Sequence, residues 1–489
     1  MKTATLRRML FSLFVILSMA AAAAAPSGQA TPDARATRVE KGLLTSSIII
    51  EGRPVKPATI AERLAALKVP GVSVAVIENG AVEWAKGYGV LEAGSATPVT
   101  AETLFQAASI SKPVAALGAL RLVEQGKLAL DENVNARLKA WKVPENEFTK
   151  TEKVTLRRLL SHTAGLTVHG FGGYQADAPV PTIVQVLDGQ KPANSAAVRA
   201  DVVPGSIWRY SGGGFTVMQL LASEAGGKPF PTLLSELVLK PVGMTSSTYE
   251  QPLPESLRKN AATGHRPNGN LLAGRYHTYP EMAAAGLWTT PTDLARFLIE
   301  IRKGLKGQSN VVSANTAHLM TTDVQGGYGL GLSLQGSGPA ASFGHGGANE
   351  GFRCQMTAFI EKGQGAVIMT NSDRGGILVG DILRAIAREY DWPAFKPRIK
   401  KIVRVAPQAL SPLTGRYQMR PGKTIDIVLE GEKLFIVDGK QKIELFPESE
   451  TSFFELVEET DIVFEKAKDG KVSGLVINGN LRAPRVGDK

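Results

Sequence analysis

The chain has a single cysteine and few aromatic residues. Cys354 stands alone among 489 residues, so no intramolecular disulfide can form and stability must come from the apolar core. The segment Gly351–Ile360 around it alternates like a strand, which favours a buried small residue over a reactive thiol. With 43% hydrophobic residues, a chain of this length can bury one sizeable core and supply a second domain. We therefore expect two domains without disulfide cross-links.

Metal-ligand spacing and nucleic-acid-binding patterns are also missing. The six histidines show no His-x-x-x-His spacing, so neither a metal nor another cofactor is expected. The formal charge is +11, but the bases are spread along the chain, with one local run at 396–401. Without basic and aromatic residues interleaved on one element, we expect no nucleic-acid partner.

The one long apolar run lies at the N-terminus. Lys2, Arg7 and Arg8 precede the run Met9–Met19 and an alanine tract that ends at Ala25. Basic, apolar and small residues in this order are typical of a secretory signal peptide, and the run is too short to favour a spanning helix. No cysteine lies near the end of this run, so a lipid anchor is not expected. We predict a signal peptide over 1–25, a periplasmic or secreted location, and no stable membrane anchor in the mature form.

Amino-acid composition and the alternation of apolar and polar residues divide the rest of the chain into segments. Residues 26–39 are rich in Ala, Pro, Gly and Ser and predict a flexible leader. Two β-type runs flank the hairpin turn Asn79-Gly80, a helical middle follows over 131–316, and further strands are expected over 342–370. Strands at both ends of a helical middle fit one domain over 40–395 with a central antiparallel sheet.

A different pattern begins after a basic linker over 396–407. Apolar and polar residues alternate in four short runs, separated by turn residues, at 424–430, 433–438, 441–446 and 471–477. This pattern predicts a small antiparallel β-domain over 408–489. No acid pair or metal-ligand cluster lies in it, so the pattern indicates no chemistry there.

A possible acylation site begins at Ser109. Lys112 follows one helical turn later, on the same helix face, where it could take the proton of the serine hydroxyl. The apolar stretch Val114–Val123 indicates a helix that starts at this point, and Pro113 suits its first turn. The pattern Ser-x-x-Lys is weak by itself. It recurs at 256–259, in a charged segment that we expect to be exposed.

Further motifs accompany this one in a fixed order. They are LLSHTAGL at 159–166, Pro204-Gly205, Tyr210-Ser211-Gly212, GLWTTPTDLARF at 286–297, GYGLG at 327–331 and His345-Gly346-Gly347. Over roughly 40–395 the chain resembles the β-lactamase-related serine hydrolases, which include class C β-lactamases, β-lactamase-fold esterases, D-aminopeptidases and penicillin-binding-protein-like enzymes. The resemblance implies an α+β fold: a β-lactamase/transpeptidase-like domain with a central antiparallel sheet flanked by helices. The C-terminal β-domain is similar to the lipocalin-like modules of some members.

The resemblance also implies roles for three residues. Ser109 would attack a carbonyl, and Lys112 would assist its deprotonation from a partly buried site that lowers the lysine pKa. Tyr210 would shuttle protons between the serine, the leaving group and water. A phenol ordinarily titrates near 10, so Tyr210 would need a cation such as Lys112 nearby to act as a base. The alternatives are a capped helix start at Ser109 and an ordinary core tyrosine at Tyr210.

His345-Gly346-Gly347 stands where relatives have Lys-Thr-Gly beside the nucleophile. Glycines at this point would let a substrate approach the backbone, and the amides of Ser109 and Ala348 would form the oxyanion hole. His345 could bind a substrate carboxylate or help proton transfer, or it could only bond locally. His162, within LLSHTAGL, is expected to make structural hydrogen bonds away from the chemistry.

Two departures from the relatives bear on the substrate. Gly212 stands where β-lactamases have an asparagine that contacts the β-lactam amide, and His345 replaces a lysine charge for the carboxylate. We therefore expect an exported serine hydrolase that acts on small esters, amides or peptides through an acyl-enzyme on Ser109. The alternatives are a β-lactamase or D-alanyl-D-alanine peptidase-type penicillin-binding protein, and a non-catalytic binding or sensing protein with the same fold.

Overall fold

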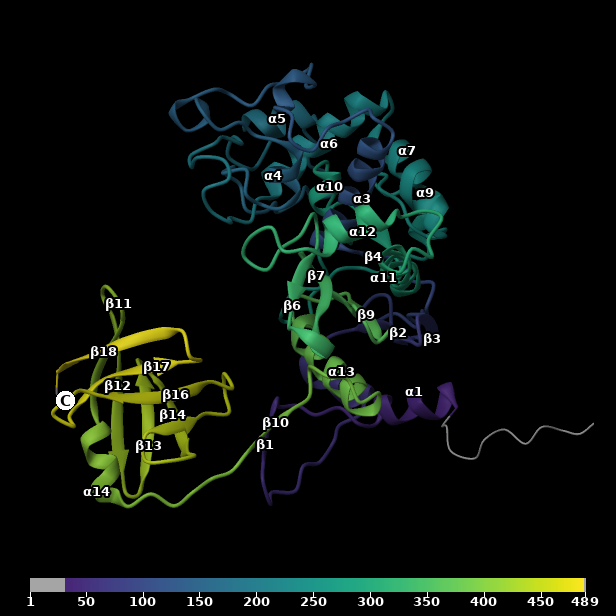
Figure 1. The fold of residues 1–489 in the computed structure, drawn as a ribbon. Coiled ribbons are helices and arrows are strands. Elements are labelled where there is room, and N and C mark those ends of the chain that lie inside the picture. The colour runs from purple at the N-terminus through teal and green to yellow at the C-terminus, as the bar shows by residue number, and fades with distance from the viewer. Residues whose placement is uncertain (1–30, 488–489) are drawn as a thin grey trace, which may run out of the picture.

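The computed structural model describes residues 31–487, so the predicted signal peptide lies outside the described residues. A larger domain of helices and strands is joined by an extended segment to a smaller β-barrel (Figure 1). This architecture confirms the predicted fold class. None of the helices between residues 31 and 487 combines the length and apolarity needed to cross a bilayer.

The larger domain is built on a six-stranded antiparallel sheet with the strand order β3-β2-β9-β8-β7-β6. Its strands are β2 (Gly71–Glu78), β3 (Ala81–Gly89), β6 (Ser333–Gln335), β7 (Ser342–Asn349), β8 (Phe352–Phe359) and β9 (Gly365–Thr370). The turn between β2 and β3 has φ of +52° at Asn79 and +76° at Gly80, as the predicted Asn-Gly hairpin requires. The strands expected over 342–370 are likewise confirmed.

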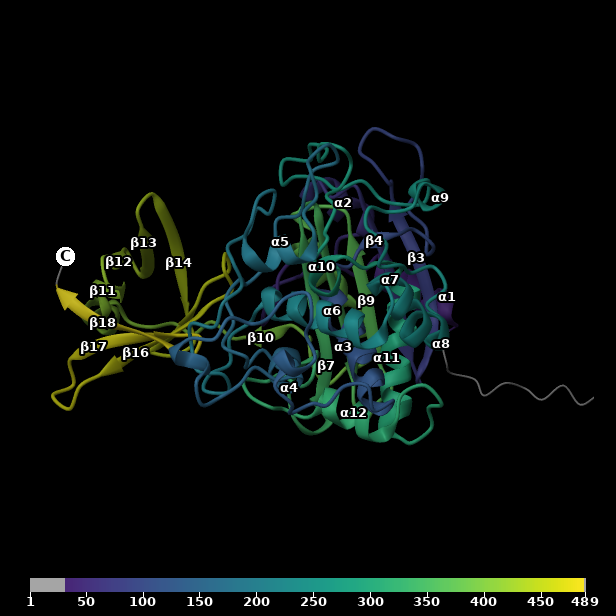
Figure 2. The ribbon, with the colours of Figure 1, turned by 90° about the horizontal axis from the view of Figure 1, so that it is seen from above.

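Helices cover both faces of this sheet, so its central strands are buried on both sides (Figures 1 and 2). Along β2, Val74 and Val76 face a core formed with α1 (Pro32–Glu40), α2 (Ile60–Leu67) and α13 (Gly375–Glu389). Ala75 and Ile77 point to the opposite core, because successive side chains of a strand alternate. The opposite core contains α3 (Ser111–Glu124), α6 (Gly212–Gly226) and α11 (Pro291–Leu305).

Shorter elements complete the layer on the side of the sheet that carries α3, α6 and α11. They are α4 (Leu156–Leu160), α5 (Ile183–Asp188), α7 (Phe230–Leu234), α8 (Lys240–Val242), α9 (Glu255–Arg258), α10 (Met282–Ala285), α12 (Ala314–Thr321) and the pair β4 (Phe105–Gln106) and β5 (Trp288–Thr289). The second Ser-x-x-Lys match overlaps α9, which has no buried residue. Its predicted exposure is therefore confirmed.

The flexible leader predicted for 26–39 is wrong from residue 32 onwards, because these residues form α1. The Thr31 hydroxyl accepts a hydrogen bond from the Ala34 amide at 3.3 Å, and Pro32 occupies the first turn. Ala36 and Val39 are fully buried beneath the helix, and Arg38 forms a two-point ion pair with Glu389 of α13. Tertiary packing thus orders a segment whose composition indicates flexibility.

The C-terminal domain is a closed barrel of eight antiparallel strands. Its strands are β11 (Gly415–Arg420), β12 (Lys423–Glu430), β13 (Lys433–Asp438), β14 (Gln441–Pro447), β15 (Ser452–Phe454), β16 (Asp461–Lys466), β17 (Val472–Ile477) and β18 (Leu481–Gly487), preceded by α14 (Pro407–Leu410). Four of them coincide with the four predicted runs. Within the linker 396–407, β10 (Arg398–Lys400) pairs in parallel with β1 (Ile48–Ile50), an interaction that no local sequence pattern predicts.

Candidate active site

Ser109 lies in a 3₁₀ turn, Ala108–Ile110, that leads directly into α3. Ala108 has a φ of +51°, which is uncommon for a residue other than glycine. The turn is held by Ser111, whose hydroxyl donates to the Ala108 carbonyl at 2.5 Å and accepts from the Leu287 amide at 2.9 Å. These buried bonds fix the half-buried Ser109 at the wall of a cavity.

Lys112 is brought to Ser109 by the helical spacing. Its Nζ atom lies 3.0 Å from Ser109 Oγ and 2.8 Å from the carbonyl oxygen of Ala284. The side chain is only 2% exposed, and this burial lowers the pKa of the Lys112 ammonium to about 7. A large neutral fraction therefore exists near neutral pH, which suits a general base.

We expect the pH dependence of ester hydrolysis to follow Lys112. The amine must be neutral to accept a proton, so kcat/KM should rise about tenfold per pH unit up to about 7 and level off above it. His345→Gln should leave the position of this limb unchanged, because burial already holds the pKa of His345 at about 3. A profile without an acidic limb between pH 5 and 7 would contradict this assignment.

Tyr210 completes the cluster around Ser109. Its hydroxyl is hydrogen-bonded to Ser109, and Lys112 Nζ lies 4.8 Å from the centre of its ring. Burial raises the pKa of the Tyr210 phenol well above its ordinary value, and the bond to Ser109 offsets this rise only in part. The expectation that Lys112 would make Tyr210 a base at neutral pH is therefore not met by the resting site. Tyr210 is a neutral phenol that can pass a proton on.

His162 holds the segment that carries Tyr210. Its carbonyl accepts from the Arg209 amide at 2.8 Å, and its Nδ1 accepts from the Ser211 amide at 3.1 Å. Its ring packs against the Tyr210 ring with centroids 4.2 Å apart. The predicted hydrogen-bonding role agrees with this geometry, but the expected position away from the chemistry is wrong, because residues on both sides of Tyr210 bond to His162.

Replacing His162 should misplace Tyr210. His162→Leu leaves the buried Ser211 amide without its acceptor, and we expect kcat to fall about 10- to 100-fold with little change in KM. His162→Asn keeps an acceptor and tolerates the φ of +60° found here, so it should retain most activity. Steady-state kinetics with thermal unfolding as the folding control checks this. Equal losses in both variants would show that the hydrogen bond does not matter.

The third motif lies on β7 beside Ser109. Only residues 342–344 of β7 pair with β6, so 345–349 have β8 on one side and an open edge on the other. Gly346 and Ala348 are exposed at this edge. A Cβ at Gly347 would lie 2.3 Å from the Ala107 carbonyl oxygen. Only glycine therefore allows the strand to approach the turn that carries Ser109 this closely. Ser109 and Ala348 line the same cavity, as an oxyanion hole made of their amides requires.

His345 is engaged locally through both ring nitrogens. Nδ1 lies 2.5 Å from the Gly346 carbonyl, which can only accept, so Nδ1 carries the proton. Nε2 then accepts from the Tyr328 hydroxyl at 2.9 Å. Burial, reinforced by the nearby Lys112, lowers the pKa of His345 to about 3, so the ring is neutral. Of the three predicted roles, the geometry favours local hydrogen bonding over carboxylate binding and proton transfer, because both ring nitrogens are engaged.

Gly212 begins α6 at a position where a side chain would be crowded. A Cβ at this position would meet the His169 carbonyl and the Phe171 ring, each at 3.1 Å. The loop that fills this space places His169 in the wall of the cavity, with its ring 4.9 Å from that of Tyr210. No sequence pattern singles out His169, because a lone histidine in a loop carries no ligand spacing.

The cavity at these residues has a volume of about 740 Å³. Ser109, Tyr210 and the strand 345–348 form one part of its lining, and Trp208 stands at its mouth, 37% exposed. Lys112 lies behind Ser109, with its amine reaching the Ser109 hydroxyl. No group of histidine, cysteine and acidic side chains suited to a metal occurs within residues 31–487. The arrangement brings a serine hydroxyl, a buried lysine amine, a phenol and a backbone edge around one space.

Comparison with known proteins agrees with this geometry. The family model described as Beta-lactamase matches residues 57–388, and the Domain of unknown function (DUF3471) matches 400–485. Penicillin-binding protein 4* of Bacillus subtilis (strain 168) is 24% identical over 421 residues, which cover 82% of this chain and 91% of that protein. Esterase EstB of Burkholderia gladioli is 27% identical over 262 residues, 48% of this chain and 66% of that protein.

Solved structures show the same fold. The octameric penicillin-binding protein homologue from Pyrococcus abyssi aligns with a TM-score of 0.58 at 24% identity, over 87% of this chain and 98% of that one. The D-amino acid amidase from Ochrobactrum anthropi SV3 aligns with a TM-score of 0.55 at 21% identity, over 68% of this chain and 96% of that one. With the family model matching most of the larger domain, the chain belongs to the β-lactamase-related serine hydrolase family.

Proposed function

We propose that this chain is a serine hydrolase that forms an acyl-enzyme on Ser109 and hydrolyses small esters, amides or peptides. The observation that carries the proposal is the 3.0 Å contact between Lys112 Nζ and Ser109 Oγ in a site where burial lowers the pKa of the lysine to about 7. A serine hydroxyl needs such a base to become a nucleophile. A non-catalytic binding protein would have no use for a buried, uncompensated lysine.

Each step can be assigned to residues of this chain. Ser109 Oγ attacks the substrate carbonyl as its proton passes to Lys112, and the amides of Ser109 and Ala348 stabilise the oxyanion. Tyr210 donates a proton to the leaving group and is reprotonated from Lys112. In the second half, water attacks the acyl carbonyl and loses its proton to the same pair. The bond between Ser109 Oγ and the acyl carbon then breaks, and Oγ takes that proton from the pair as the acid leaves. No metal or cofactor enters these steps.

Esters are the substrates that the site suits best. A β-lactam would lack the asparagine contact, because Gly212 has no side chain and the loop of His169 crowds the position. It would also lack a cation at position 345, because His345 is neutral and bound to Tyr328. The second candidate, a β-lactamase or D-alanyl-D-alanine peptidase-type enzyme, is supported by the similarity to Penicillin-binding protein 4*. Export to the periplasm or medium is part of the proposal and is supported by the residue order of the N-terminal 25 residues.

The experiment compares kcat/KM for p-nitrophenyl butyrate and nitrocefin on one preparation. We expect the ester to be turned over at least about tenfold faster, because it needs only the nucleophile, the proton relay and the oxyanion hole. D-amino-acid amides in the same screen test amide hydrolysis. Slow inhibition by penicillins is compatible with the proposal, since acylation can precede a slow second half. A higher kcat/KM for nitrocefin than for the ester would instead favour the second candidate, a β-lactamase or D-alanyl-D-alanine peptidase-type enzyme.

A further inference from the structure

His169 lies in the loop between α4 and α5 and lines the cavity beside Tyr210. The side chain is exposed, and the centre of its ring is 4.9 Å from that of the Tyr210 ring. Neither ring nitrogen of His169 takes part in a hydrogen bond in the part of the chain that the structure describes. A neutral imidazole accepts a hydrogen bond at one nitrogen and donates one from the other. The ring can therefore bind a small polar molecule inside the cavity.

The backbone of this loop is fixed at the N-terminus of α6. The Val168 carbonyl accepts a hydrogen bond from the Gly213 amide at 3.0 Å, and the His169 carbonyl accepts from the Gly212 amide at the same distance. Val168 has a φ of +65°, which is strained for a β-branched residue. Such strain persists only where the surrounding contacts determine the backbone, and it is concentrated at functional sites. The position of His169 is thus defined although its ring is exposed.

Tyr210 marks the side of the acyl carbonyl from which the leaving group departs. Its hydroxyl is hydrogen-bonded to Ser109, and in the proposed reaction it gives the leaving group a proton. Once the leaving group has gone, this side of the carbonyl is open. Water attack is the reverse of that departure in its geometry, so water enters from the same side. The attacking water therefore arrives next to Tyr210, where the ring of His169 also lies.

An attacking water needs two hydrogen-bond acceptors. A lone pair of its oxygen must face the carbonyl carbon, so both of its hydrogens have to be held by other groups. The Tyr210 oxygen can accept one hydrogen while the phenol passes its own proton to Lys112. The second hydrogen requires another acceptor on the same side of the cavity.

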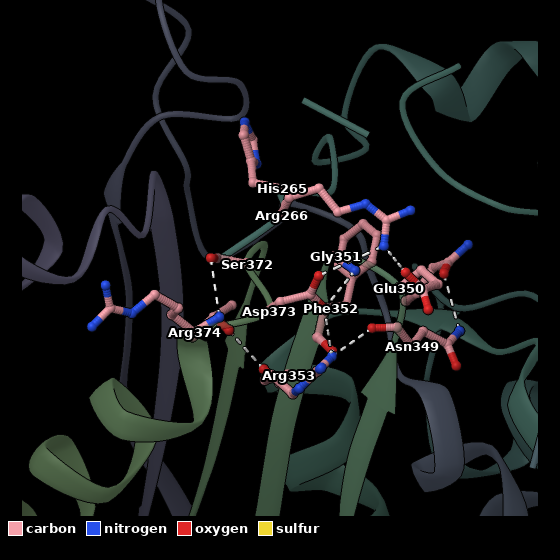
Figure 3. A network of polar contacts seen from close by, with 12 residues as sticks. His265, Arg266, Asn349, Glu350, Gly351, Phe352, Arg353, Ser372, Asp373 and Arg374 are labelled. Atoms are coloured by element: carbon pink, nitrogen blue, oxygen red, sulfur yellow. Dashed lines mark hydrogen bonds and ion pairs between the residues drawn. The ribbon is translucent and has the colours of Figure 1, made fainter. Parts of the chain in front are cut away.

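Most other polar side chains in the cavity wall cannot accept this bond. Both nitrogens of His345 are already engaged. Arg209 and Arg353 also line the cavity, but a guanidinium carries donors only. Arg353 is moreover held 2.9 Å from an Asp373 carboxylate oxygen (Figure 3).

Gln355 has an acceptor oxygen but points away from Tyr210. Its neighbours on β8, Cys354 and Met356, belong to the core that contains α3. Because successive side chains of a strand alternate, Gln355 lies on the opposite face of the sheet. An imidazole nitrogen of His169 is therefore the side-chain acceptor that is free on the side of Tyr210.

We propose that His169 is a further catalytic residue, which accepts a hydrogen bond from the water that attacks the acyl-enzyme and orients it towards the acyl carbonyl. This role rests on the proposed hydrolase function. The water oxygen bonds to the acyl carbon as one of its protons passes to Tyr210 and Lys112, and that proton later returns to Ser109 Oγ. The hydrogen held by His169 stays on the water oxygen and leaves with the acid. His169 gains and loses no proton.

Replacing both ring nitrogens tests this role. His169→Phe keeps a ring beside Tyr210 but has no acceptor, so we expect deacylation to slow about 10- to 100-fold and acylation by p-nitrophenyl butyrate to change less than about threefold. Stopped-flow absorbance should show a burst of about one p-nitrophenol per enzyme, and intact-mass spectrometry should show the butyryl-enzyme. His169→Gln keeps an acceptor oxygen and should lose less than about fivefold. His318→Phe, exposed on α12 outside the cavity, is the matched control and should behave like the wild type.

The ratio of the two rates separates this proposal from a structural role and from the hydrolase function. Acylation and deacylation that slow equally in His169→Phe, or a variant that turns over without accumulating butyryl-enzyme, would overturn the role of His169 and leave the hydrolase function standing. A wild type that neither forms a butyryl-enzyme nor releases p-nitrophenol would overturn both proposals. Thermal unfolding confirms that each variant is folded. If His169→Phe does not fold, His169→Leu replaces it with the same expected result.

Discussion

Lys112→Ala should lower kcat/KM for p-nitrophenyl butyrate by about a thousandfold or more. The contact of Nζ with Ser109 Oγ is the only one in the described site that links the nucleophile to a group with a pKa near neutrality. General-base catalysis is worth about 10²- to 10⁴-fold, and the buried amine has no carboxylate partner whose loss would complicate the result. Lys112→Arg is the matched control, because it keeps a cation but cannot become neutral. We expect it to be as inactive as Lys112→Ala.

Tyr210→Phe removes the phenol hydroxyl and keeps the ring that packs against His162. If Lys112 and Tyr210 form one proton relay, each single replacement should cost most of the turnover and the double variant little more. Thermal unfolding of the four proteins checks that folding is retained. Full additivity of the two losses would mean that the residues serve separate steps.

Local sequence patterns predicted the elements whose partners lie nearby in the chain. The hairpin of β2 and β3 follows from the β-type runs on either side of Asn79-Gly80. Strands β12, β13 and β14 follow from alternating apolar and polar residues separated by turn residues. In the barrel, β15 spans three residues and β18 contains Pro484, so neither has a strong strand pattern. Closure of the barrel gives both of them neighbours that a local pattern does not reveal.

Local sequence patterns did not predict the elements that depend on contacts between residues far apart in the chain. The pairing of β1 with β10 joins residues near 48 and 398, and α1 is ordered by its burial against α13. The cap at Thr31, the proline at position 32 and Asp33 in the first turn do form a helix start, and they outweigh the composition of the leader.

In the candidate active site, too, motif spacing predicts some contacts, whereas others depend on the folded chain. The spacing of Ser109 and Lys112 implies their contact, and the order of motifs implies that Tyr210 and His345 come near them. Burial decides what those groups can do, and it is not visible in a motif. It leaves His345 neutral and keeps Tyr210 protonated. The positions of His162, His169 and Arg353 depend on loops and strand faces that only the folded chain brings to the cavity.

Ser109→Ala should lower kcat for ester hydrolysis by about 10⁴- to 10⁶-fold, to the residual rate that substrate binding and the oxyanion hole support. Without the hydroxyl no acyl-enzyme can form, and the remaining groups only bind and polarise a carbonyl. The replacement removes one oxygen atom from a half-buried position, so the fold should be preserved. Ser256→Ala, in the exposed second Ser-x-x-Lys match on α9, is the matched control and should behave like the wild type.

Covalent labelling of Ser109 tests the central claim most directly. A fluorophosphonate probe should add one label to the wild type and to Ser256→Ala, with the label on the peptide that contains Ser109, as intact-mass and peptide mass spectrometry would show. Ser109→Ala should remain unlabelled under the same conditions. Equal labelling of Ser109→Ala and the wild type, or a label on another residue, would contradict the assignment of Ser109 as the nucleophile.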